Sequence, residues 1–487
     1  MVATVTSVAQ VGIEPRAVRV ETHIGPPKPQ FTLVGLPDTA VREARERVRA
    51  AMVSSGYTFP ERRVIVNLAP ADLPKAGSAY DLPIALGVLA ADGTVPPGAA
   101  RVVALGELAL DGSVRRARGA IGAAVVASRL GLPCLVAPEG AAEASRVPGV
   151  DLRPVRTLAE AVSVALGETA PVAVPTRPVS TDPLPDLADV RGQPIARRAL
   201  EIAAAGGHHL FLYGPPGTGK TMLARRLPGL LPRSQPSEEL EIAAIWSAAD
   251  RPLGEDRPFR SPHHSISLAG LVGGGSGVPS PGEISLAHHG VLFLDELGEF
   301  PAHLLDALRQ PIEEGVVVIA RRGISVRFPT RVQVVAASNP CPCGFFGDRR
   351  QPCQCTAAAA QRYRRRISGP LLDRFDLRVA VPRSEHLDLT ASPGEPSVKV
   401  AARVAAAREH QEKRGSLNRD LERKVLDDQP MEPAAMRMLT GAVERLGLSG
   451  RGYDRVRRVA RTVADLAGRE GIVEADIGEA LFLRGSL

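Results

Sequence analysis

One stretch of this 487-residue sequence has the spacing of a phosphate-binding loop. It reads Gly214-Pro215-Pro216-Gly217-Thr218-Gly219-Lys220-Thr221 and fits the pattern G-x-x-x-x-G-K-[ST]. The backbone N–H groups of such a loop face an anion, and the helix that follows contributes the positive end of its dipole. We expect Lys220 to reach the β- and γ-phosphates of ATP and the Thr221 hydroxyl to bind Mg²⁺.

Two acids and one amide stand at the ends of two further apolar runs. Asp295 and Glu296 follow the run 291–294, and Asn339 follows the run 332–337 after one serine. Asp295 is expected to hold Mg²⁺, directly or through water, and Glu296 to polarise the attacking water. The amide of Asn339 could orient that water. Together with the loop, these residues predict an ATPase.

The apolar runs must position these side chains as neighbouring strands. Residues 210–213 lead into the loop, and residues 222–231 follow it with helical spacing. Four successive apolar residues at 291–294 indicate a strand buried on both faces, as in parallel sheets. Between the two motifs, residues 268–282 contain six glycines, which predicts a mobile loop. We therefore expect an α/β core with a parallel sheet.

Composition describes a soluble globular protein of two or three domains, with 44% apolar and 23% charged residues. The net charge of +7 is compatible with a nucleic-acid partner. No run approaches the length of a membrane span, and the first residues lack the features of a signal peptide. We expect a cytoplasmic protein.

Four of the five cysteines are crowded into the pattern C-x-C-x9-C-x-C, at Cys341, Cys343, Cys353 and Cys355. Two pairs of thiolates on a short loop can form a tetrahedral zinc site. An iron–sulfur cluster uses equally thiolate-rich ligands, and four free thiols without metal are the third alternative. Six arginines surround the cysteines: Arg349, Arg350, Arg362, Arg364, Arg365 and Arg366.

Two pairs of adjacent histidines, at 263–264 and 288–289, resemble further metal ligands. No acid or cysteine stands at ligand spacing beside either pair in the sequence. We interpret these histidines as polar lining or as packed residues.

Residues 1–168 alternate strand-like and helix-like patterns, which predicts a separate α/β domain. This region resembles the C-terminal domain of Lon-type proteases, which has a ribosomal-S5-like fold. The segments 74–82 and 106–121 match those that carry Lon's catalytic serine and lysine. In register, however, the two catalytic positions are occupied by Ala79 and Ile121.

The substitutions at these two positions remove the chemistry of a protease. Ser78 stands one residue from the nucleophile position, but an isoleucine at the other position cannot act as a base. We therefore expect a proteolytically inactive domain that serves as a scaffold or as a DNA-facing module.

A proline-rich linker, 169–185, leads into residues 186–384, which resemble an AAA+ P-loop core. Its first residues, 186–193, are similar to the adenine-contacting start of AAA+ modules. Residues 385–487 resemble an AAA+ helical lid of the magnesium-chelatase C-terminal type.

The resemblance to AAA+ rings assigns roles to two arginines. The run 371–376 reads L-L-D-R-F-D, a pattern whose arginine reaches the γ-phosphate in the neighbouring subunit. Arg374 is therefore the expected arginine finger, and hydrolysis would depend on oligomerisation. A local ion pair with the flanking acids is the alternative. In the lid, register places Arg451 at the position that contacts ATP, with Arg455 as the second candidate.

Alternating residues on both sides of Arg321 and Arg322 predict a β-hairpin between residues 316 and 328. In related AAA+ DNA motors a hairpin at this place projects into the central pore, so the resemblance implies that both arginines bind DNA. The alternative is a solvated hairpin whose arginines pair with Glu313 and Glu314.

The Lon-like region, the magnesium-chelatase-type core, the cysteines and the stretch 260–264 together resemble the ComM (YifB) family across essentially the whole chain. The resemblance implies a hexameric motor with helicase and branch-migration activity on single-stranded and branched DNA during natural transformation. The ATP motifs predict ATP and Mg²⁺ as cofactors and the four cysteines favour Zn²⁺, whereas recombination proteins are expected partners on the resemblance alone. A metal-chelatase motor subunit would leave the first domain and the cysteines unexplained. Ala79 and Ile121 argue against an ATP-dependent protease.

Overall fold

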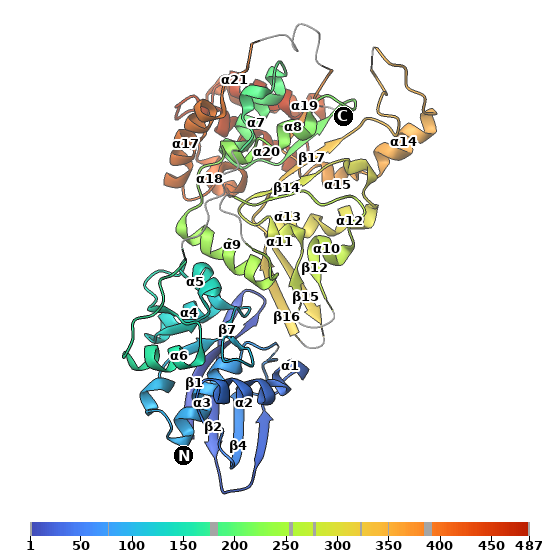
Figure 1. Ribbon diagram of the computed structural model, residues 1–487. Coiled ribbons are helices and arrows are strands. Elements are labelled where there is room, and N and C mark those ends of the chain that lie inside the picture. The colour runs from blue at the N-terminus through green and yellow to red at the C-terminus, as the bar shows by residue number, and fades with distance from the viewer. Residues whose placement is uncertain are drawn as a thin grey trace.

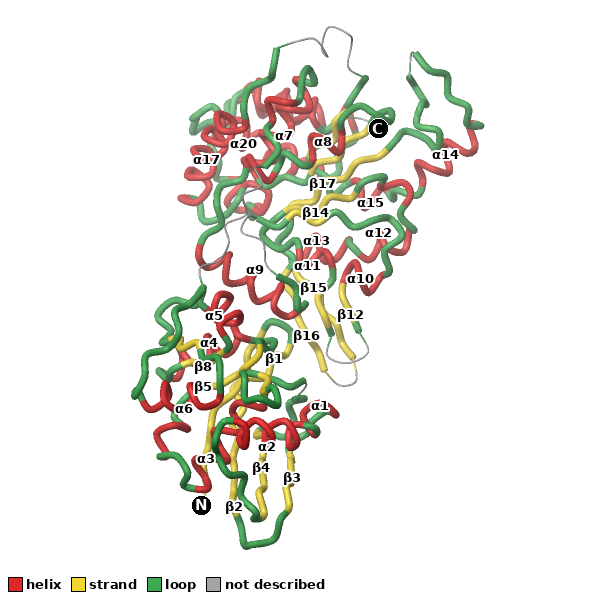
Figure 2. Tube along the Cα trace, viewed as in Figure 1, coloured by secondary structure: helices red, strands yellow, loops and turns green. Residues whose placement is uncertain are grey.

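Two β-sheets and a C-terminal group of helices organise the chain (Figures 1 and 2). The computed structural model describes residues 2–75, 77–175, 184–252, 257–275, 279–321, 324–348, 350–383 and 392–485. No helix in these ranges is long and apolar enough to cross a membrane.

The N-terminal region is built on a mixed seven-stranded sheet in the order β3-β4-β2-β1-β5-β8-β9. Its strands are β1 (Val2–Val11), β2 (Glu14–Ile24), β3 (Gln30–Val34), β4 (Arg63–Ala69), β5 (Val103–Leu105), β8 (Cys134–Val136) and β9 (Leu152–Pro154). A short hairpin of β6 (Glu107–Leu108) and β7 (Val114–Arg115) stands beside it. The helices are α1 (Thr39–Arg42), α2 (Ala44–Ser54), α3 (Asp81–Asp92), α4 (Ala120–Leu130), α5 (Pro138–Ala144) and α6 (Leu158–Leu166).

The core sheet has five strands in the order β11-β14-β17-β10-β18, and every neighbouring pair is parallel. They are β10 (Leu210–Tyr213), β11 (Phe259–Arg260), β14 (Val291–Leu294), β17 (Gln333–Ser338) and β18 (Leu377–Ala380). Successive residues of β14 enter two different apolar clusters, Val291 and Phe293 on one face and Leu292 and Leu294 on the other. The predicted parallel sheet, buried on both faces, is confirmed.

Helices cover both faces of this sheet. One face packs against α7 (Pro194–Gly206) and the C-terminal helices α17 (Ser397–Lys413), α19 (Pro433–Leu446), α20 (Gly450–Leu466) and α21 (Glu474–Leu483). The short helix α18 (Arg423–Asp427) contacts α20. Residues of α10 (Leu268–Val272), α11 (Glu283–Leu286), α12 (Ala302–Ala307) and α15 (Gly369–Leu372) pack on the other face. The C-terminal helices are therefore part of the core's own hydrophobic interior.

Two local predictions are wrong. The helix expected over 222–231 is α8 (Lys220–Ala224), followed by a separate 3-10 turn at Pro228–Leu230. Pro228 lacks the N–H that a continuing helix needs. The glycine-rich segment 268–282 begins with a helix, α10, whose first turn is capped by the Ser267 hydroxyl. It continues into the paired strands β12 (Gly273–Gly274) and β13 (Ser280–Pro281), and residues 276–278 lie outside the described ranges.

The N-terminal region contacts the core through α9 (Pro236–Ala248). Leu240 and Ala243 of this helix join an apolar cluster of the N-terminal region, against α4. Arg118 adds an ion pair of 2.7 Å to Asp250. Of the predicted linker, residues 176–183 lie outside the described ranges.

Candidate functional site

The phosphate loop joins β10 to α8 at the carboxyl edge of the core sheet. Gly217 and Gly219 have φ angles of 77° and 88°, in the left-handed region that glycine enters without a steric cost. A Cβ on Gly214 would lie 2.2 Å from the carbonyl oxygen of Val381. The backbone thus requires glycine at the positions that define the motif.

The ammonium group of Lys220 lies where three strand ends meet. Its Nζ donates to the carbonyl oxygens of Gly214 at 2.7 Å and Pro215 at 2.8 Å, and to Oδ1 of Asn339 at 3.2 Å. Burial lowers the pKa of Lys220 to about 8, although the two acids that follow β14 oppose this shift. A phosphate ligand would restore the ordinary preference of this lysine for the charged form.

The Thr221 hydroxyl donates to Oδ2 of Asp295 at 2.8 Å. The other carboxylate oxygen of Asp295 accepts the backbone N–H of Glu296 at 3.0 Å. A hydroxyl and a carboxylate are the hard oxygen ligands that Mg²⁺ prefers, so this pair fits the expected metal.

Glu296 has a φ of 52°, a left-handed conformation that is uncommon for a residue other than glycine. Such backbone strain clusters at functional sites. Nδ1 of His264 lies 3.6 Å from the Glu296 carboxylate. The interpretation of His264 as a lining residue did not predict this contact with Glu296. Its position just after β11, the strand that pairs with β14, could have indicated it.

Arg374 lies at the sheet edge opposite to the phosphate loop. It stands three residues before Leu377, which pairs with Leu210 at the start of β10, whereas the loop follows the end of that strand. Because the strands are parallel, the two sites face opposite edges of the sheet. An arginine finger at this position therefore suits the phosphates of another subunit rather than those of its own chain.

The Arg374 side chain is engaged within its own chain and is only 10% exposed. It forms an ion pair with Glu313, and Nη2 of Arg451 lies 3.2 Å from the same carboxylate. The alternative, a local ion pair with the flanking acids, is not formed, because Asp373 pairs with Arg378 at 3.2 Å and Asp376 with Arg455 at 2.5 Å. Arg451 is 69% exposed in the first turn of α20, and Arg455 is held at the base of β18.

The four clustered cysteines converge as a metal site would require. Cys341, Cys343 and Cys353 have Sγ–Sγ distances of 3.4 to 3.6 Å, and all four Sγ atoms lie within 4.8 Å of one another. Metal–sulfur bonds of about 2.3 Å in a tetrahedron place the sulfurs about 3.8 Å apart. The cluster could therefore hold one metal ion.

Backbone N–H groups point at the sulfurs of the cluster. Those of Cys343, Phe346 and Cys355 donate to Sγ of Cys355, Cys341 and Cys353 at 3.3 to 3.4 Å. Hydrogen bonds of this kind stabilise thiolates and orient metal ligands.

Glu241 of α9 completes a second cluster with His288 and His289, which the sequence spacing did not reveal. Nδ1 of His288 accepts the Arg331 backbone N–H at 2.9 Å, so Nε2 carries the proton and donates to Glu241 at 2.8 Å. Burial lowers the pKa of His288 to about 4, which keeps the ring neutral. Neither nitrogen of His288 is then available to a metal, and the interpretation as packed residues fits the geometry.

The predicted hairpin is confirmed as β15 (Val316–Arg321) paired with β16 (Ile324–Pro329) in antiparallel register. Arg321 is exposed, whereas Arg322 lies outside the described residues. Glu313, one of the two acids suggested as partners of these arginines, pairs with Arg374 and Arg451 instead.

The positions that correspond to Lon's catalytic pair lie in one apolar cluster. Ile121 is 4% exposed in this cluster, and Ala79 packs against it. The Ser78 hydroxyl donates to the Glu107 carboxylate. The serine–lysine pair of Lon is absent here, because Ala79 and Ile121 occupy its two positions.

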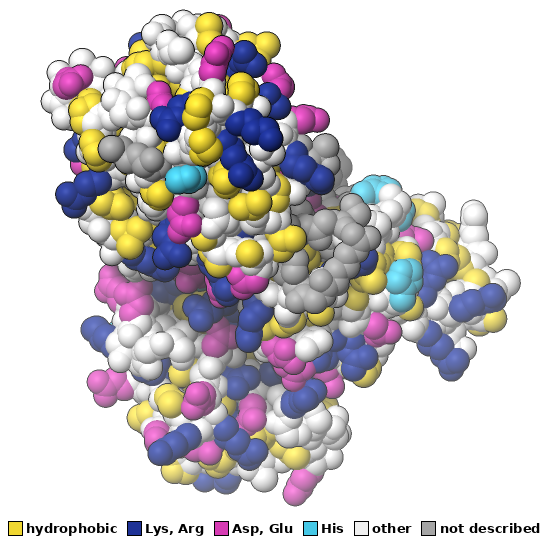
Figure 3. Space-filling model, turned by 90° about the horizontal axis from the view of Figure 1, so that it is seen from below, with side chains coloured by type: hydrophobic (Ala, Val, Ile, Leu, Met, Phe, Trp, Pro, Cys, Tyr) yellow, Lys and Arg dark blue, Asp and Glu magenta, His cyan; other side chains and the backbone are white. Residues whose placement is uncertain are grey.

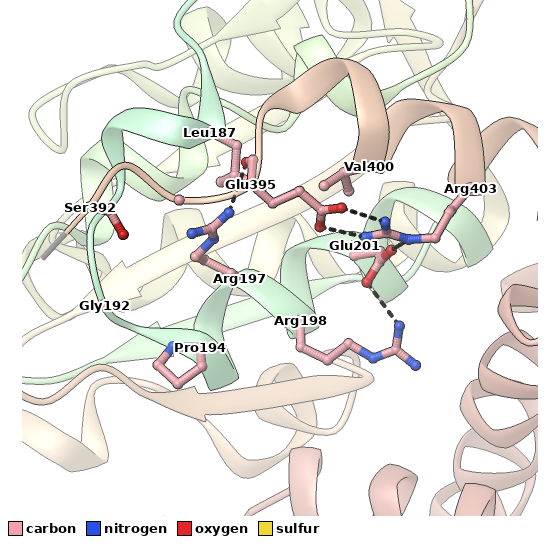
Figure 4. A pocket seen from close by; sticks show the side chains of 11 residues that line it. Leu187, Gly192, Pro194, Arg197, Arg198, Glu201, Ser392, Glu395, Val400 and Arg403 are labelled. Carbon is pink, nitrogen blue, oxygen red and sulfur yellow. Dashed lines mark hydrogen bonds and ion pairs between the residues drawn. The ribbon is translucent and has the colours of Figure 1, made fainter.

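A cavity of about 520 Å³ lies beside the segment expected to contact adenine. Figure 4 shows Leu187 and Gly192 on its wall, together with Arg403, which forms ion pairs with Glu201 at 2.6 Å and Glu395 at 2.7 Å. Its volume is that of a small-molecule site. The sequence had not indicated these charged residues, because they come together only when α17 packs on α7.

Comparison with known proteins extends these observations to the whole chain. The chain is 43% identical to the competence protein ComM of Haemophilus influenzae, over 99% of this chain and 97% of that protein. It is 44% identical to the YifB protein of Escherichia coli, over 98% and 96%. The chain belongs to the ComM/YifB family. In this chain a magnesium-chelatase-like AAA+ core is flanked by further matched regions on both sides.

Family models match most of this ComM/YifB chain. Residues 186–389 match magnesium chelatase, subunit ChlI; residues 20–141 match subunit ChlI of Mg-chelatase; residues 394–484 match the ChlI C-terminal region. Lon protease 2 of Bacillus subtilis is 30% identical over 32% of this chain and 29% of that protein. The α/β fold class with Lon-like and AAA+ relatives is confirmed, and AAA+ membership implies ATP and Mg²⁺.

Proposed function

We propose that this protein is an ATP-driven DNA motor that works as a hexamer on single-stranded and branched DNA. Two contacts at the phosphate loop carry the proposal, that of Lys220 with Asn339 and that of Thr221 with Asp295. They occur in a chain that is similar over nearly its full length to a competence protein. Helicase and branch-migration activity in homologous recombination and natural transformation is the role that this similarity favours, in the cytoplasm and with recombination proteins as partners.

ATP hydrolysis uses the residues at the carboxyl edge of the core sheet. Lys220 exchanges its contacts to the loop carbonyls for contacts to the β- and γ-phosphates of ATP. Glu296 accepts a proton from the attacking water, and Asn339 orients that water. Thr221 and Asp295 would hold Mg²⁺, which neutralises phosphate charge when it is bound.

Assembly completes this site with residues from a second subunit. Arg374 faces away from its own phosphate loop, which supports its role as a finger toward a neighbouring subunit. To serve there, its guanidinium must leave Glu313. Arg451 of the lid shares the Glu313 carboxylate with Arg374, so it would also contact ATP in the site of a neighbouring subunit.

The hairpin of β15 and β16 provides the pore contact with DNA. Arg321 and Arg322 bind phosphates without reading sequence, and movement of the hairpin pulls the strand. The base of the hairpin is linked to the strands that carry Asp295 and Asn339, which supports coupling to the nucleotide state.

Zinc is the metal that best suits the four cysteines. Sulfur–sulfur distances of 3.4 to 3.6 Å fit one tetrahedral ion. An iron–sulfur cluster, in which inorganic sulfides separate the cysteine ligands, would require wider spacing.

A chelatase-type motor acting on a protein partner is the second candidate, favoured by the names of the three matching family models. The two candidates differ in what stimulates hydrolysis. We expect forked or single-stranded DNA to bind the purified protein and to accelerate its ATP turnover. An active ATPase that neither binds nor responds to DNA would contradict the motor and favour the chelatase-type function.

A further inference from the structure

The cysteine loop and the helix after it form a projecting arm. We define the cysteine arm as residues 340–348 and 350–366, which include α14 (Ala357–Arg365). Figure 1 shows α14 at the upper right, far from the hairpin of β15 and β16. Figure 3 shows Lys and Arg side chains gathered at the right-hand end of the molecule, where α14 lies in Figure 1.

The exposed side of α14 is basic. At about 100° of rotation per residue, Arg365 lies almost opposite the buried Tyr363, and Arg362 and Arg364 lie about 100° to either side of it. All three are exposed. None of the three forms an ion pair with a carboxylate among the residues that the structure describes, whereas Arg366 pairs with Glu299 at 3.3 Å. Three exposed, uncompensated guanidinium groups make a surface for an anionic partner.

An exposed aromatic ring accompanies these arginines. Phe346 is 44% exposed, and the Arg364 guanidinium lies 4.7 Å from its ring centroid. The Phe346 N–H donates to Sγ of Cys341 at 3.3 Å, so the cysteine cluster holds this ring beside α14. Flat rings and guanidinium planes together form a platform on which nucleic-acid bases stack.

The base of the arm contacts the ATP site at several points. A Cβ on Gly344 would lie 2.6 Å from Cδ of Pro216, so the cysteine loop packs directly on the phosphate loop. Tyr363 packs equally closely on Gly298, two residues after Glu296. Arg366 donates to the Gly298 carbonyl at 3.1 Å.

We propose that the cysteine arm binds single-stranded DNA and transmits this contact to the ATP site. The inference rests on the proposed DNA motor, but it assigns a second DNA contact, separate from the hairpin. Arg362, Arg364 and Arg365 bind backbone phosphates, and a base stacks on Phe346. DNA on the arm shifts α14, and α14 in turn shifts the backbone beside Pro216 and Glu296.

The test uses the full-length protein and a triple variant, Arg362→Ala/Arg364→Ala/Arg365→Ala. Its matched control removes three exposed arginines from the C-terminal helices, as Arg423→Ala/Arg437→Ala/Arg445→Ala. An Arg→Lys triple variant at 362, 364 and 365 keeps the charge. Binding of oligo(dT) across a salt series and ATP turnover with and without oligo(dT) are measured for each protein.

We expect the alanine triple variant to lose DNA-stimulated turnover. The slope of log affinity against log salt should fall by about two, since three phosphate contacts are lost from a single strand. The control should behave as wild type, and the lysine variant should recover most of the affinity. Turnover without DNA checks that the ATP site is intact.

Two results would overturn the inference. Wild-type affinity and salt slope in the alanine variant would exclude the DNA contact and leave these arginines to an acidic protein. Weakened affinity with full stimulation would exclude the coupling to the ATP site. If wild-type protein itself neither binds nor responds to DNA, the motor proposal fails, and that result is distinct from both.

Discussion

Nζ of Lys220 and Oδ1 of Asn339 lie 3.2 Å apart, so the phosphate loop and the end of β17 are in direct contact. Asn339 is also the last residue before the cysteine arm. A shift of Asn339 when phosphates bind or leave would therefore act directly on residue 340, the first residue of the cysteine arm. The nucleotide site and the arm belong to one continuous stretch of backbone.

Glu296→Gln should bind ATP but hydrolyse it at least about 100-fold more slowly, because an amide cannot accept the proton of the attacking water. Turnover and ATP affinity, measured separately, check this expectation. Glu239→Gln, which removes an exposed carboxylate on α9, is the control and should leave both unchanged. Near-normal turnover in Glu296→Gln would remove Glu296 from its assigned role.

The affinity for ATP should fall as the pH rises above about 8. In the free protein burial lowers the pKa of Lys220 to about 8, whereas bound phosphates favour the charged ammonium and raise it. The affinity is then constant below this value and weakens by up to about tenfold per pH unit above it. Calorimetry in buffers of different ionisation enthalpy should show proton uptake on ATP binding. Lys220→Ala should lose this uptake, and a wild-type affinity independent of pH would contradict the assignment.

The parallel sheet and the ATP motifs were predictable because both are local in sequence. Val291 to Leu294 form an unbroken apolar run, which is typical of a strand buried on both faces. The glycines of the loop reflect backbone conformations that other residues avoid. Apolar runs and glycine positions of this kind can be recognised in the sequence without knowledge of the tertiary structure.

Contacts between distant segments were not predictable. Glu313 holds Arg374 and Arg451, which are 61 and 138 positions further along the chain. Likewise, Glu241 meets His288 only because α9 packs against α11. The helix end at Ala224 was a different error, since Pro228 was visible in the sequence and its effect on the helix was underestimated.

The purified protein should contain about one zinc ion per chain. Cys343→Ser should lose the metal and render the arm sensitive to proteases, because thiolate sites contribute folding energy to the segments they join. Elemental analysis and limited proteolysis measure the two effects. Cys134→Ala, at the buried free cysteine of β8, should retain the metal. Iron, or no metal in protein purified without chelator, would overturn the zinc assignment.

Arg374→Ala should assemble and bind ATP but hydrolyse it poorly, by a factor of about 10³ or more if the finger acts in trans. Mixed with Lys220→Ala subunits, it should regain some turnover, because each variant supplies the group that the other lacks. Glu313→Gln is the companion variant, since it frees Arg374 from its ion pair without removing it. Absence of recovery in mixed rings with confirmed subunit exchange would count against the trans arrangement.

The last prediction concerns the tip of the β15–β16 hairpin. Arg321→Ala/Arg322→Ala should assemble and hydrolyse ATP without DNA as wild type does, yet lose DNA-stimulated turnover and the unwinding of forked DNA. Two phosphate contacts fewer should reduce the salt slope of DNA binding by about 1.5.

Arg327→Ala provides the matched control for the single variant Arg321→Ala. Arg327 is exposed on the same hairpin and pairs with Val318 in the middle of the ribbon. Its replacement by alanine therefore removes one positive charge, as Arg321→Ala does, but at a position away from the tip. If position in the pore matters, Arg321→Ala should slow unwinding and Arg327→Ala should not. Equal effects would indicate a general electrostatic attraction, and a double tip variant that unwinds at the wild-type rate would exclude the hairpin as the pulling element. Other residues would then have to pull the DNA strand, and the cysteine arm would be the first segment to test.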